Sequence, residues 1–316
     1  MNIVMLEPLG VKPEALEAAF APFKDAGHAV TLCTAKLTEE EKIARAKDAD
    51  IFVIANSPLT AAVINAAENL KMVCVAFTGI DHVDLDACRA KDVRVCNAQG
   101  YATEATAEVA IGMMLSCLRN LVPYDKVVRE GGVLAGYKHN TLQGKTVGIV
   151  GTGAIGCRVM ELAKAFGCKI LAYSKSQRQA ALDLGAEYVD LETLFAESDI
   201  VSLHTPLNAE TKGLVSRELI TKMKETAILV NCARGAVVDS EALAEALNEG
   251  RIHAAGIDVY EMEPPIPAEH PLLNARNAYL TPHVGFFSEE SLLDRLGIVI
   301  ANVDAFLKGA PINVKL

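Results

Sequence analysis

Residues 147–156 read Val-Gly-Ile-Val-Gly-Thr-Gly-Ala-Ile-Gly, and Gly151, Gly153 and Gly156 give this stretch the spacing G-x-G-x-x-G. The apolar residues before the glycines predict a strand, and the residues after them predict a helix. In that context Gly151 permits a tight turn, Gly153 lets the backbone approach a ligand, and Gly156 lets the helix pack against the strand. The first N–H groups of such a helix, at the positive end of its dipole, favour phosphate groups. The stretch therefore predicts a dinucleotide-binding turn.

The segment after the next strand is where a site of this kind contacts the ribose of the adenosine. Sites of this kind usually place Asp or Glu about 20 residues after the glycines, where it accepts hydrogen bonds from ribose hydroxyls. Here residues 174–178 read Ser-Lys-Ser-Gln-Arg and contain no carboxylate. Ser174, Lys175 and Arg178 would instead favour a 2′-phosphate. The sequence thus predicts NADP slightly over NAD, and the alternative is that Lys175 and Arg178 are solvated surface charges.

Apolar strands alternate with helices on both sides of the glycine turn in this chain of 316 residues. Such alternation, with strands that are apolar throughout, indicates parallel sheets covered by helices on both faces. A long helix over 103–120 joins two series of strands, about twenty irregular residues follow it, and a last helix covers 289–308. The predicted strands cover residues 3–6, 29–33, 51–55, 72–77, 93–96, 146–150, 169–173, 199–204, 227–231, 254–258 and 278–281.

We therefore expect an α/β fold with two Rossmann/flavodoxin-like parallel-sheet domains and a cleft between them. The last helix comes after the second series of strands is complete, and it can pack back on the first series. The expected dinucleotide-binding Rossmann domain covers residues 100–286. A discontinuous substrate-binding (lid) domain is expected over residues 1–99 plus 287–316.

Composition argues against several classes of protein. With 30 Lys and Arg against 40 Asp and Glu the formal net charge is −10, and there is no Trp, so that neither a basic surface nor an aromatic platform for nucleic acid is expected. The eight cysteines include no C-x-x-C pair, which favours reduced thiols over a zinc site. The longest mostly apolar stretch, 109–118, is about half a membrane span. We expect a cytoplasmic protein that binds no metal, nucleic acid or membrane.

Three polar residues, Arg234, Glu263 and His283, follow later strands, and ligands bind beyond the carboxyl ends of parallel strands. Arg234 can hold a carboxylate or carbonyl oxygen, and His283 can give a proton to an oxygen that becomes a hydroxyl. A carboxylate behind the imidazole fixes its tautomer and favours its protonated form. Glu263 suits this role better than Glu261, because it precedes two prolines. Such a set suits hydride transfer to a 2-oxo acid. Asn56, which follows an earlier strand, is expected to face the cleft, although a plain turn explains it equally.

The chain resembles the D-isomer-specific 2-hydroxyacid dehydrogenases over nearly its whole length. The motifs that carry the resemblance are residues 78–84 (TGIDHVD), 144–151 (GKTVGIVG), 204–207 (HTPL), 231–235 (NCARG), 258–261 (DVYE) and 281–284 (TPHV). The resemblance implies an NAD(P)-dependent oxidoreductase with Arg234 as substrate anchor, His283 as acid and base, and Glu263 as the partner of that histidine. It also implies that backbone N–H groups of Thr78 and Gly79 bind the substrate carboxylate. The further cofactor contacts that it implies are Ala154, Ile155, Thr205, Pro206, Cys232, Asp258 and Gly285.

The resemblance also implies a homodimer through helix 103–120, and it makes glyoxylate or hydroxypyruvate the first substrate candidates. Two alternatives stay open. Phe286 and Phe287 stand where many members have smaller residues, and together with Phe77 and Tyr101 they would shape an apolar pocket for a larger 2-oxo acid. The other alternative is a non-catalytic, dinucleotide-sensing module, like the corepressor relatives of this family.

Overall fold

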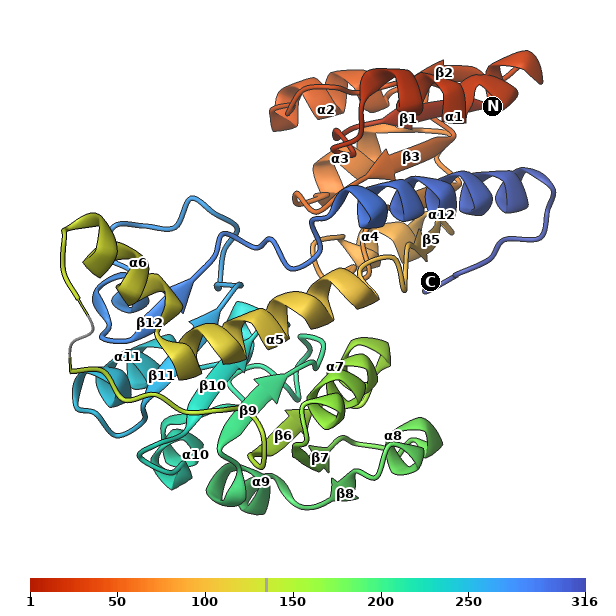
Figure 1. Cartoon of the computed structure of the whole chain (residues 1–316). Helices are drawn as coiled ribbons and strands as arrows, with labels where there is room; N and C mark the ends of the chain where they lie inside the picture. Colours follow the sequence, from red (N-terminus) through yellow and green to blue (C-terminus); the bar gives the residue numbers. More distant parts are fainter. Residues whose placement is uncertain (134–135) are drawn as a thin grey trace. The chain divides into compact units, whose positions relative to one another are not determined.

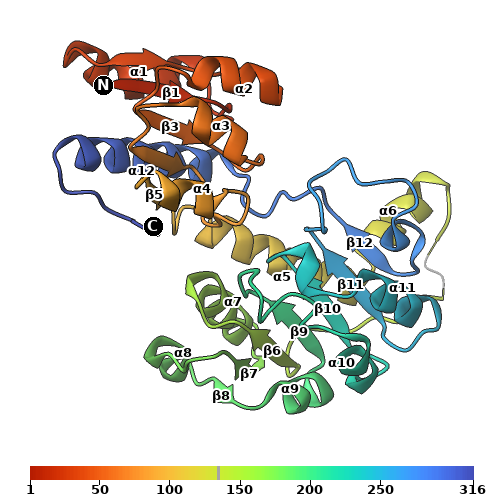
Figure 2. The same cartoon turned by 180° about the vertical axis from the view of Figure 1, so that it is seen from behind.

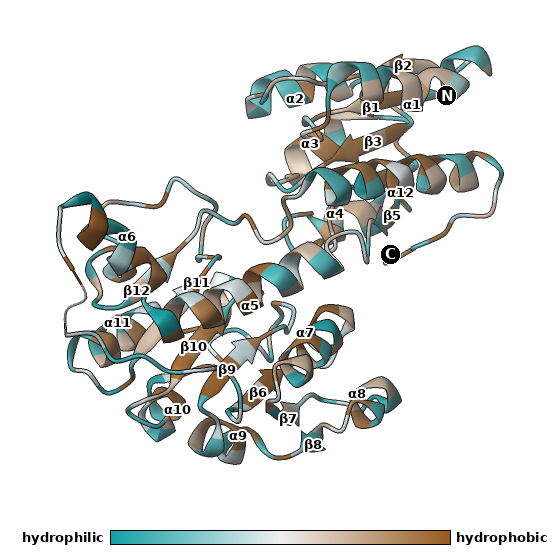
Figure 3. Cartoon of the chain, in the orientation of Figure 1, coloured by the Kyte–Doolittle hydropathy of each residue, from teal (hydrophilic) through white to brown (hydrophobic). Residues whose placement is uncertain are grey.

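The computed structural model describes residues 1–133 and 136–316, and it divides the chain into two compact units (Figure 1). Unit 1 comprises Met1–Ala102 and Phe287–Leu316, and unit 2 comprises Thr103–Phe286. Each unit carries its own parallel sheet. Hydrophobic residues run along the strands of both sheets, as Figure 3 shows. The predicted α/β fold with two parallel sheets is confirmed.

The sheet of unit 1 has the strand order β2-β1-β3-β4-β5, which is the flavodoxin-like arrangement. Every residue of β3 and β4 is buried, as expected for strands covered on both faces. The strands are β1 (Asn2–Met5), β2 (Ala29–Thr31), β3 (Ile51–Ile54), β4 (Met72–Val75) and β5 (Arg94–Asn97). The helices are α1 (Pro13–Asp25), α2 (Glu39–Ala46), α3 (Ala61–Ala66), α4 (Leu85–Ala90) and α12 (Glu289–Leu307).

Helix α12 belongs to unit 1 although it lies at the other end of the chain. It packs on β4, β5 and α1, as Figure 2 shows. Its buried apolar residues Leu292, Leu296, Val299 and Val303 recur at helical spacing and form one face. This amphipathic spacing explains why the last helix packs on the sheet that the first hundred residues form.

The sheet of unit 2 has the strand order β12-β11-β10-β9-β6-β7-β8. The chain runs outward from β6 in one direction and from β9 in the other, so the loops after these two strands diverge at a topological switch point. The strands are β6 (Thr146–Val150), β7 (Lys169–Tyr173), β8 (Glu187–Tyr188), β9 (Ile200–Leu203), β10 (Ile228–Asn231), β11 (Ala254–Ile257) and β12 (Ala278–Leu280). The helices are α5 (Thr103–Arg119), α6 (Leu121–Arg129), α7 (Ala154–Ala165), α8 (Gln179–Asp183), α9 (Leu191–Glu197), α10 (Arg217–Lys222) and α11 (Ser240–Asn248).

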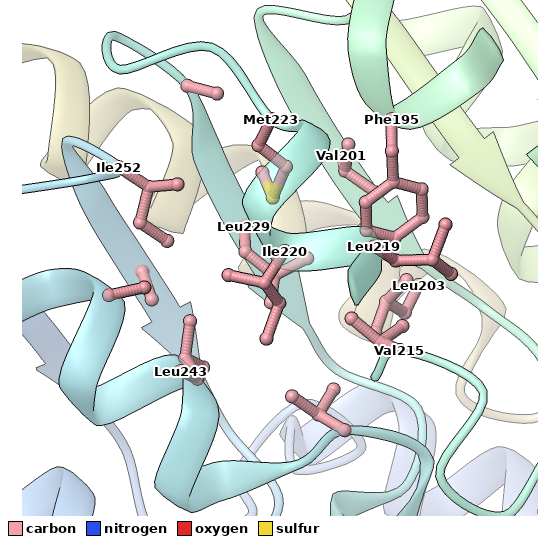
Figure 4. Close-up of a cluster of buried hydrophobic side chains, with 14 of the residues drawn as sticks. Phe195, Val201, Leu203, Val215, Leu219, Ile220, Met223, Leu229, Leu243 and Ile252 are labelled. Atoms are coloured by element: carbon pink, nitrogen blue, oxygen red, sulfur yellow. The ribbon is translucent and has the colours of Figure 1, made fainter. Parts of the chain in front are cut away.

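Two layers of buried side chains sandwich the sheet of unit 2. On one face Val201 and Leu203 of β9 pack with Phe195, Leu219 and Leu243 of the helices α9, α10 and α11 (Figure 4). On the other face Ile200 packs with residues of α5 and α7, among them Ala107, Met114, Val159 and Met160. The alternation along β9 therefore fills both layers, and the carboxyl ends of the strands are left to the connecting loops.

One predicted segment is wrong. The residues after helix 103–120 are not all irregular, because Leu121–Arg129 form helix α6. This helix has no buried residue, so the periodic burial that reveals a helix in a sequence is missing. Pro123 lies in its first turn, where proline is tolerated. No single helix of the described residues is long and apolar enough to cross a membrane; α5 and α6 together would be, but the chain bends by 59° between them.

Candidate active site

The glycine turn lies between β6 and α7, beside the switch point of the sheet. Gly151 has a φ of +99°, and a Cβ there would lie 2.6 Å from the carbonyl oxygen of His204. A Cβ on Gly156 would overlap the carbonyl oxygen of Gly151. Gly153 begins α7 without a side-chain cap, and no described atom lies within 4 Å of the place its Cβ would take. The backbone at this uncapped helix start, followed by Ala154 and Ile155, is therefore open to close approach by a ligand, which fits a dinucleotide pyrophosphate.

The loop after β7 carries the residues expected near the adenosine ribose. Ser174 is half-buried, whereas Lys175 and Arg178 are exposed. The Nζ atom of Lys175 lies 2.8 and 2.9 Å from the two carboxylate oxygens of Glu210. The backbone N–H of Arg178 donates to the hydroxyl of Tyr188 at 3.0 Å. A carboxylate, that of Glu210, is therefore present beside the loop after β7, and the loop after β9 supplies it.

Thr205 and Pro206 open the loop after β9, next to the glycine turn. The backbone nitrogen of Thr205 would lie 2.9 Å from a Cβ on Gly151, so the two loops are packed together. Farther along, the side-chain Oδ1 of Asn208 accepts a hydrogen bond from the backbone N–H of Glu210 at 2.9 Å. This local turn fixes the backbone of Glu210 on the side where the residues that follow β7 also lie.

Asp258 follows β11, is only 1% exposed, and holds the segment that carries His283. Its carboxylate accepts hydrogen bonds from the hydroxyl of Thr281 at 2.5 Å and from the N–H groups of Val284 and Gly285, both at 2.8 Å. Its carbonyl oxygen accepts the N–H of His283 at 2.8 Å. His283 is thereby kept in the left-handed region, with a φ of +56°, which residues other than glycine rarely adopt.

The imidazole of His283 pairs with Glu263. Its Nδ1 lies 3.0 and 2.8 Å from the two carboxylate oxygens, and the histidine side chain is 16% exposed. Because a carboxylate only accepts hydrogen bonds, Nδ1 carries a proton and Nε2 is the nitrogen that can exchange one. The ring of Phe286 meets the imidazole edge-on, at 5.4 Å between centroids. Glu261, the weaker candidate from the sequence, faces His270 instead, at 3.0 Å.

Arg234 is positioned by the residues around it in the loop after β10. The side chain of Asn231 accepts the N–H of Ala233 at 3.0 Å and donates to the carbonyl of Arg234 at 2.9 Å. A Cβ on Gly235 would overlap the backbone of Tyr260, so this loop lies directly against the one after β11. The structure brings Glu263 and His283 together and places Arg234 in the adjoining loop at the same edge of the sheet.

Asn56, Thr78 and Gly79 belong to unit 1, where they follow β3 and β4. The buried carboxylate of Glu7 accepts the backbone N–H groups on both sides of Asn56, each at 3.1 Å. The side chain of Asn97 donates to the carbonyl of Thr78 at 2.6 Å. Within unit 1 these contacts organise the carboxyl edge of its own sheet.

One expected cofactor contact points elsewhere, and some residues were missed. The thiol of Cys232 is buried 3.9 Å from the sulfur of Met113 in α5, and burial raises its pKa. Glu210 and His270 carry no local sequence signal, because Lys175, the partner of Glu210, lies in another loop and Glu261, the partner of His270, lies nine residues away in an irregular connection. Thr281 ends a predicted strand and could have been identified by that position. In the described part of the chain, no group of three or more His, Cys, Asp or Glu side chains is arranged to hold a metal ion.

Comparison with known proteins identifies the family of the chain. The family model "D-isomer specific 2-hydroxyacid dehydrogenase, NAD binding domain" matches residues 111–285. The chain belongs to this family. The dehydrogenase is 34% identical over 322 residues to a hydroxypyruvate reductase of Blautia hydrogenotrophica, and the alignment covers 99% of each chain. It is 41% identical over 277 residues to a glyoxylate reductase of Korarchaeum cryptofilum, which covers 84% of this chain and 82% of the relative. A solved acyclic imino acid reductase in complex with NADPH and D-Arg covers 100% of both chains, with a TM-score of 0.89 and 28% identity.

The family gives the class of chemistry in which the site takes part. The dehydrogenase is an oxidoreductase that moves a hydride between a nicotinamide cofactor and a 2-oxo acid or its D-2-hydroxy acid. The glycine turn with its uncapped helix start and the pair of imidazole and carboxylate lie at one edge of the sheet of unit 2. Such an edge suits a dinucleotide at the switch point and a proton donor beside it.

Proposed function

We propose that the dehydrogenase reduces small 2-oxo acids, with glyoxylate and hydroxypyruvate as the preferred substrates. The observation that carries this proposal is the contact of Nδ1 of His283 with both carboxylate oxygens of Glu263, next to the loop that holds Arg234. The names of the relatives, hydroxypyruvate reductase and glyoxylate reductase, support this substrate class.

The residues of the site divide the work of the reduction among them. The nicotinamide, when bound, supplies the hydride for the carbonyl carbon. Arg234 binds the substrate and stabilises the negative charge that develops on its oxygen. His283 gives the proton of Nε2 to that oxygen, and Glu263 stabilises the imidazolium and fixes the plane of its ring. In the oxidative direction His283 accepts the hydroxyl proton.

The two units have different roles in this proposal. Unit 2 is the dinucleotide-binding domain, because it contains the glycine turn and the uncapped start of α7. Unit 1 is the substrate-binding domain, in which the backbone N–H groups of Thr78 and Gly79 bind the substrate carboxylate and Asn56 is a further substrate-binding residue. The support for these roles is the position of the residues after β3 and β4 and the resemblance to the family.

The cofactor is proposed to be NADP slightly in preference to NAD. Ser174, Lys175 and Arg178 favour a 2′-phosphate, since no carboxylate directly follows β7. Glu210 limits this preference, because its carboxylate contacts the ammonium of Lys175 and is repelled by a phosphate. Both cofactors are therefore expected to bind.

Single-turnover reduction of a panel of 2-oxo acids, run with NADH and with NADPH, tests the substrate and the cofactor together. Glyoxylate or hydroxypyruvate should be reduced with the highest kcat/KM. A preference for an acid with a large apolar side chain would favour the second candidate, which the edge-on contact of Phe286 with His283 supports. If no acid is reduced although both dinucleotides bind, the chain is a dinucleotide sensor and the proposed activity is wrong.

The dehydrogenase is further proposed to be a homodimer in the cytoplasm. Helix α5, where the resemblance to the family places the interface, has eight of its 17 residues buried within its own chain. Helix α6 is a better candidate, because Leu121, Val122 and Val128 expose 54%, 63% and 71% of their surface. The eight cysteines form no disulfide, which supports a reducing compartment.

A further inference from the structure

A second pair of glutamate and histidine lies in the loop that carries Glu263. Two residues earlier, Oε2 of Glu261 lies 3.0 Å from Nε2 of His270, and Oε1 of Glu261 accepts the hydroxyl proton of Ser240 at 2.5 Å. The side chain of His270 is only 6% exposed, whereas that of Glu263 is 51% exposed. His270 is thus buried, whereas the side chain of its partner Glu261 is 34% exposed, less than that of Glu263; we call Glu261 and His270 the inner pair.

The protons of this inner pair can be assigned. The backbone N–H of Leu272 points at Nδ1 of His270, at 3.4 Å, so Nδ1 is an acceptor. Nε2 therefore carries the proton and donates it to the carboxylate of Glu261. Although burial raises the pKa of Glu261, the hydrogen bonds from His270 and Ser240 lower it overall, so this carboxylate is ionised at neutral pH.

The pair of Glu261 and His270 also holds Tyr260, the residue before Glu261. The ring of His270 meets the ring of Tyr260 edge-on, at 5.6 Å between centroids, and the hydroxyl of Tyr260 donates to the carbonyl of Thr281 at 3.1 Å. Thr281 in turn donates to the carboxylate of Asp258. Contacts thus hold the loop after β11 at residues 258, 260 and 261. Glu263, which contacts His283, follows two residues later in the same loop.

We propose that His270 and Glu261 are positioning residues for the proton transfer: they hold the loop so that the carboxylate of Glu263 stays against His283. Without the inner pair, the half-exposed side chain of Glu263 can exchange its imidazole contact for water, and the ring of His283 loses its fixed orientation. The inference rests on the proposed function, since it assigns His283 the role of proton donor. It assigns His270 and Glu261 a role through Glu263 and not in the chemistry itself.

The test compares two substitutions of His270. His270→Ala removes the donor to Glu261, and we expect kcat for the oxo acid to fall about tenfold while the dissociation constants of NADH and NADPH stay unchanged. His270→Gln places an amide N–H near the former Nε2 and should restore most of kcat. The solvent deuterium isotope effect on kcat should rise in His270→Ala, because proton donation becomes slower. Thermal unfolding and dinucleotide binding show whether each variant is folded.

A double-mutant cycle with Glu263→Gln separates positioning from general stability. If His270 acts through Glu263, the double variant His270→Ala/Glu263→Gln loses no more activity than Glu263→Gln alone. Additive losses, or a loss of kcat with an unchanged isotope effect, would overturn the inference. If the wild-type protein reduces no 2-oxo acid, the proposed function fails. The inference then fails separately if His270→Ala leaves the imidazole NMR signals of His283 unchanged, because the orientation of that ring would not depend on His270.

Discussion

The backbone of Tyr260 occupies the space that a side chain on Gly235 would need. Gly235→Ala should therefore be destabilising by about 1–3 kcal/mol, the usual cost of overpacking, and it should lower kcat because the loops of Arg234 and Glu263 are forced apart. The matched control is Gly153→Ala, where the Cβ enters open space and φ is −71°. This control should keep its melting temperature and instead bind both dinucleotides about tenfold more weakly. Equal melting temperatures for the two variants would contradict the packing argument.

Removal of the imidazole should separate chemistry from binding. His283→Ala is expected to lower kcat by about 10²–10⁴-fold, which is the usual contribution of a positioned acid, and to leave the dissociation constants of the dinucleotides unchanged. Arg234→Ala should raise KM for the oxo acid, because the substrate loses its anchor, and should also lower kcat, because the developing negative charge is no longer stabilised. Stopped-flow single turnovers and fluorescence titration measure both quantities. Loss of dinucleotide binding in His283→Ala would show that the residue is structural.

Glu210 should modulate the choice of cofactor. In Glu210→Gln the amide no longer neutralises Lys175 or repels a phosphate, so affinity for NADPH relative to NADH should increase about two- to fivefold, the size expected for an exposed pair. Lys175→Gln should change the ratio in the opposite direction. Titration with 2′-AMP and with AMP measures the same effect without turnover. An unchanged ratio in both variants would mean that the ion pair plays no part in cofactor selection.

The exposed face of α6 should hold two copies of the chain together. Val128→Lys, which places a charge at a position that is 71% exposed, should shift the dimer towards monomers in analytical ultracentrifugation. Lys126→Glu changes charge on the same helix without touching its apolar residues and should leave the dimer intact. A wild-type protein that sediments as a monomer would rule this interface out.

Stability should fall in mild acid because of His204. Burial lowers the pKa of this imidazole from 6.5 to about 4, and its Nε2 lies 2.9 Å from the hydroxyl of Ser202. The unfolded chain therefore binds the proton more readily, so the stabilising contribution is complete above about pH 6.5 and is lost as the pH falls towards 4. The loss amounts to about 3 kcal/mol. Chemical denaturation at several pH values should show a flatter profile for His204→Asn; the same slope in both proteins would assign the effect to another group.

The parts of the structure that local patterns encode were the parts that the sequence could predict. Buried parallel strands are apolar throughout, and the turn after β6 needs its glycines for steric reasons, so both are visible in a single chain. Helix α6 was not predicted because none of its residues is fully buried, so no burial pattern marks it. The alternation of strands and helices therefore predicts the two sheets well and the exposed connections poorly.

At the site, contacts between residues far apart in the sequence limit what could be predicted. Glu263 could be chosen over Glu261 from the prolines that follow it, and the structure places it against His283. The contact of Lys175 with Glu210 joins residues 35 positions apart on two loops, and nothing in either loop specifies the other.

The loops after β10, β11 and β12 interlock: Gly235 packs on Tyr260, Tyr260 bonds to Thr281, and Asp258 holds the turn that contains His283. For an engineer who wants another substrate, this means that the three loops form a poor place for random mutation, because a change in one is transmitted to the others. Phe287 lies at the far end of the loop after β12, where unit 1 resumes, and is 60% exposed, so it is a better first position for a substrate-range library than the residues that join the three loops.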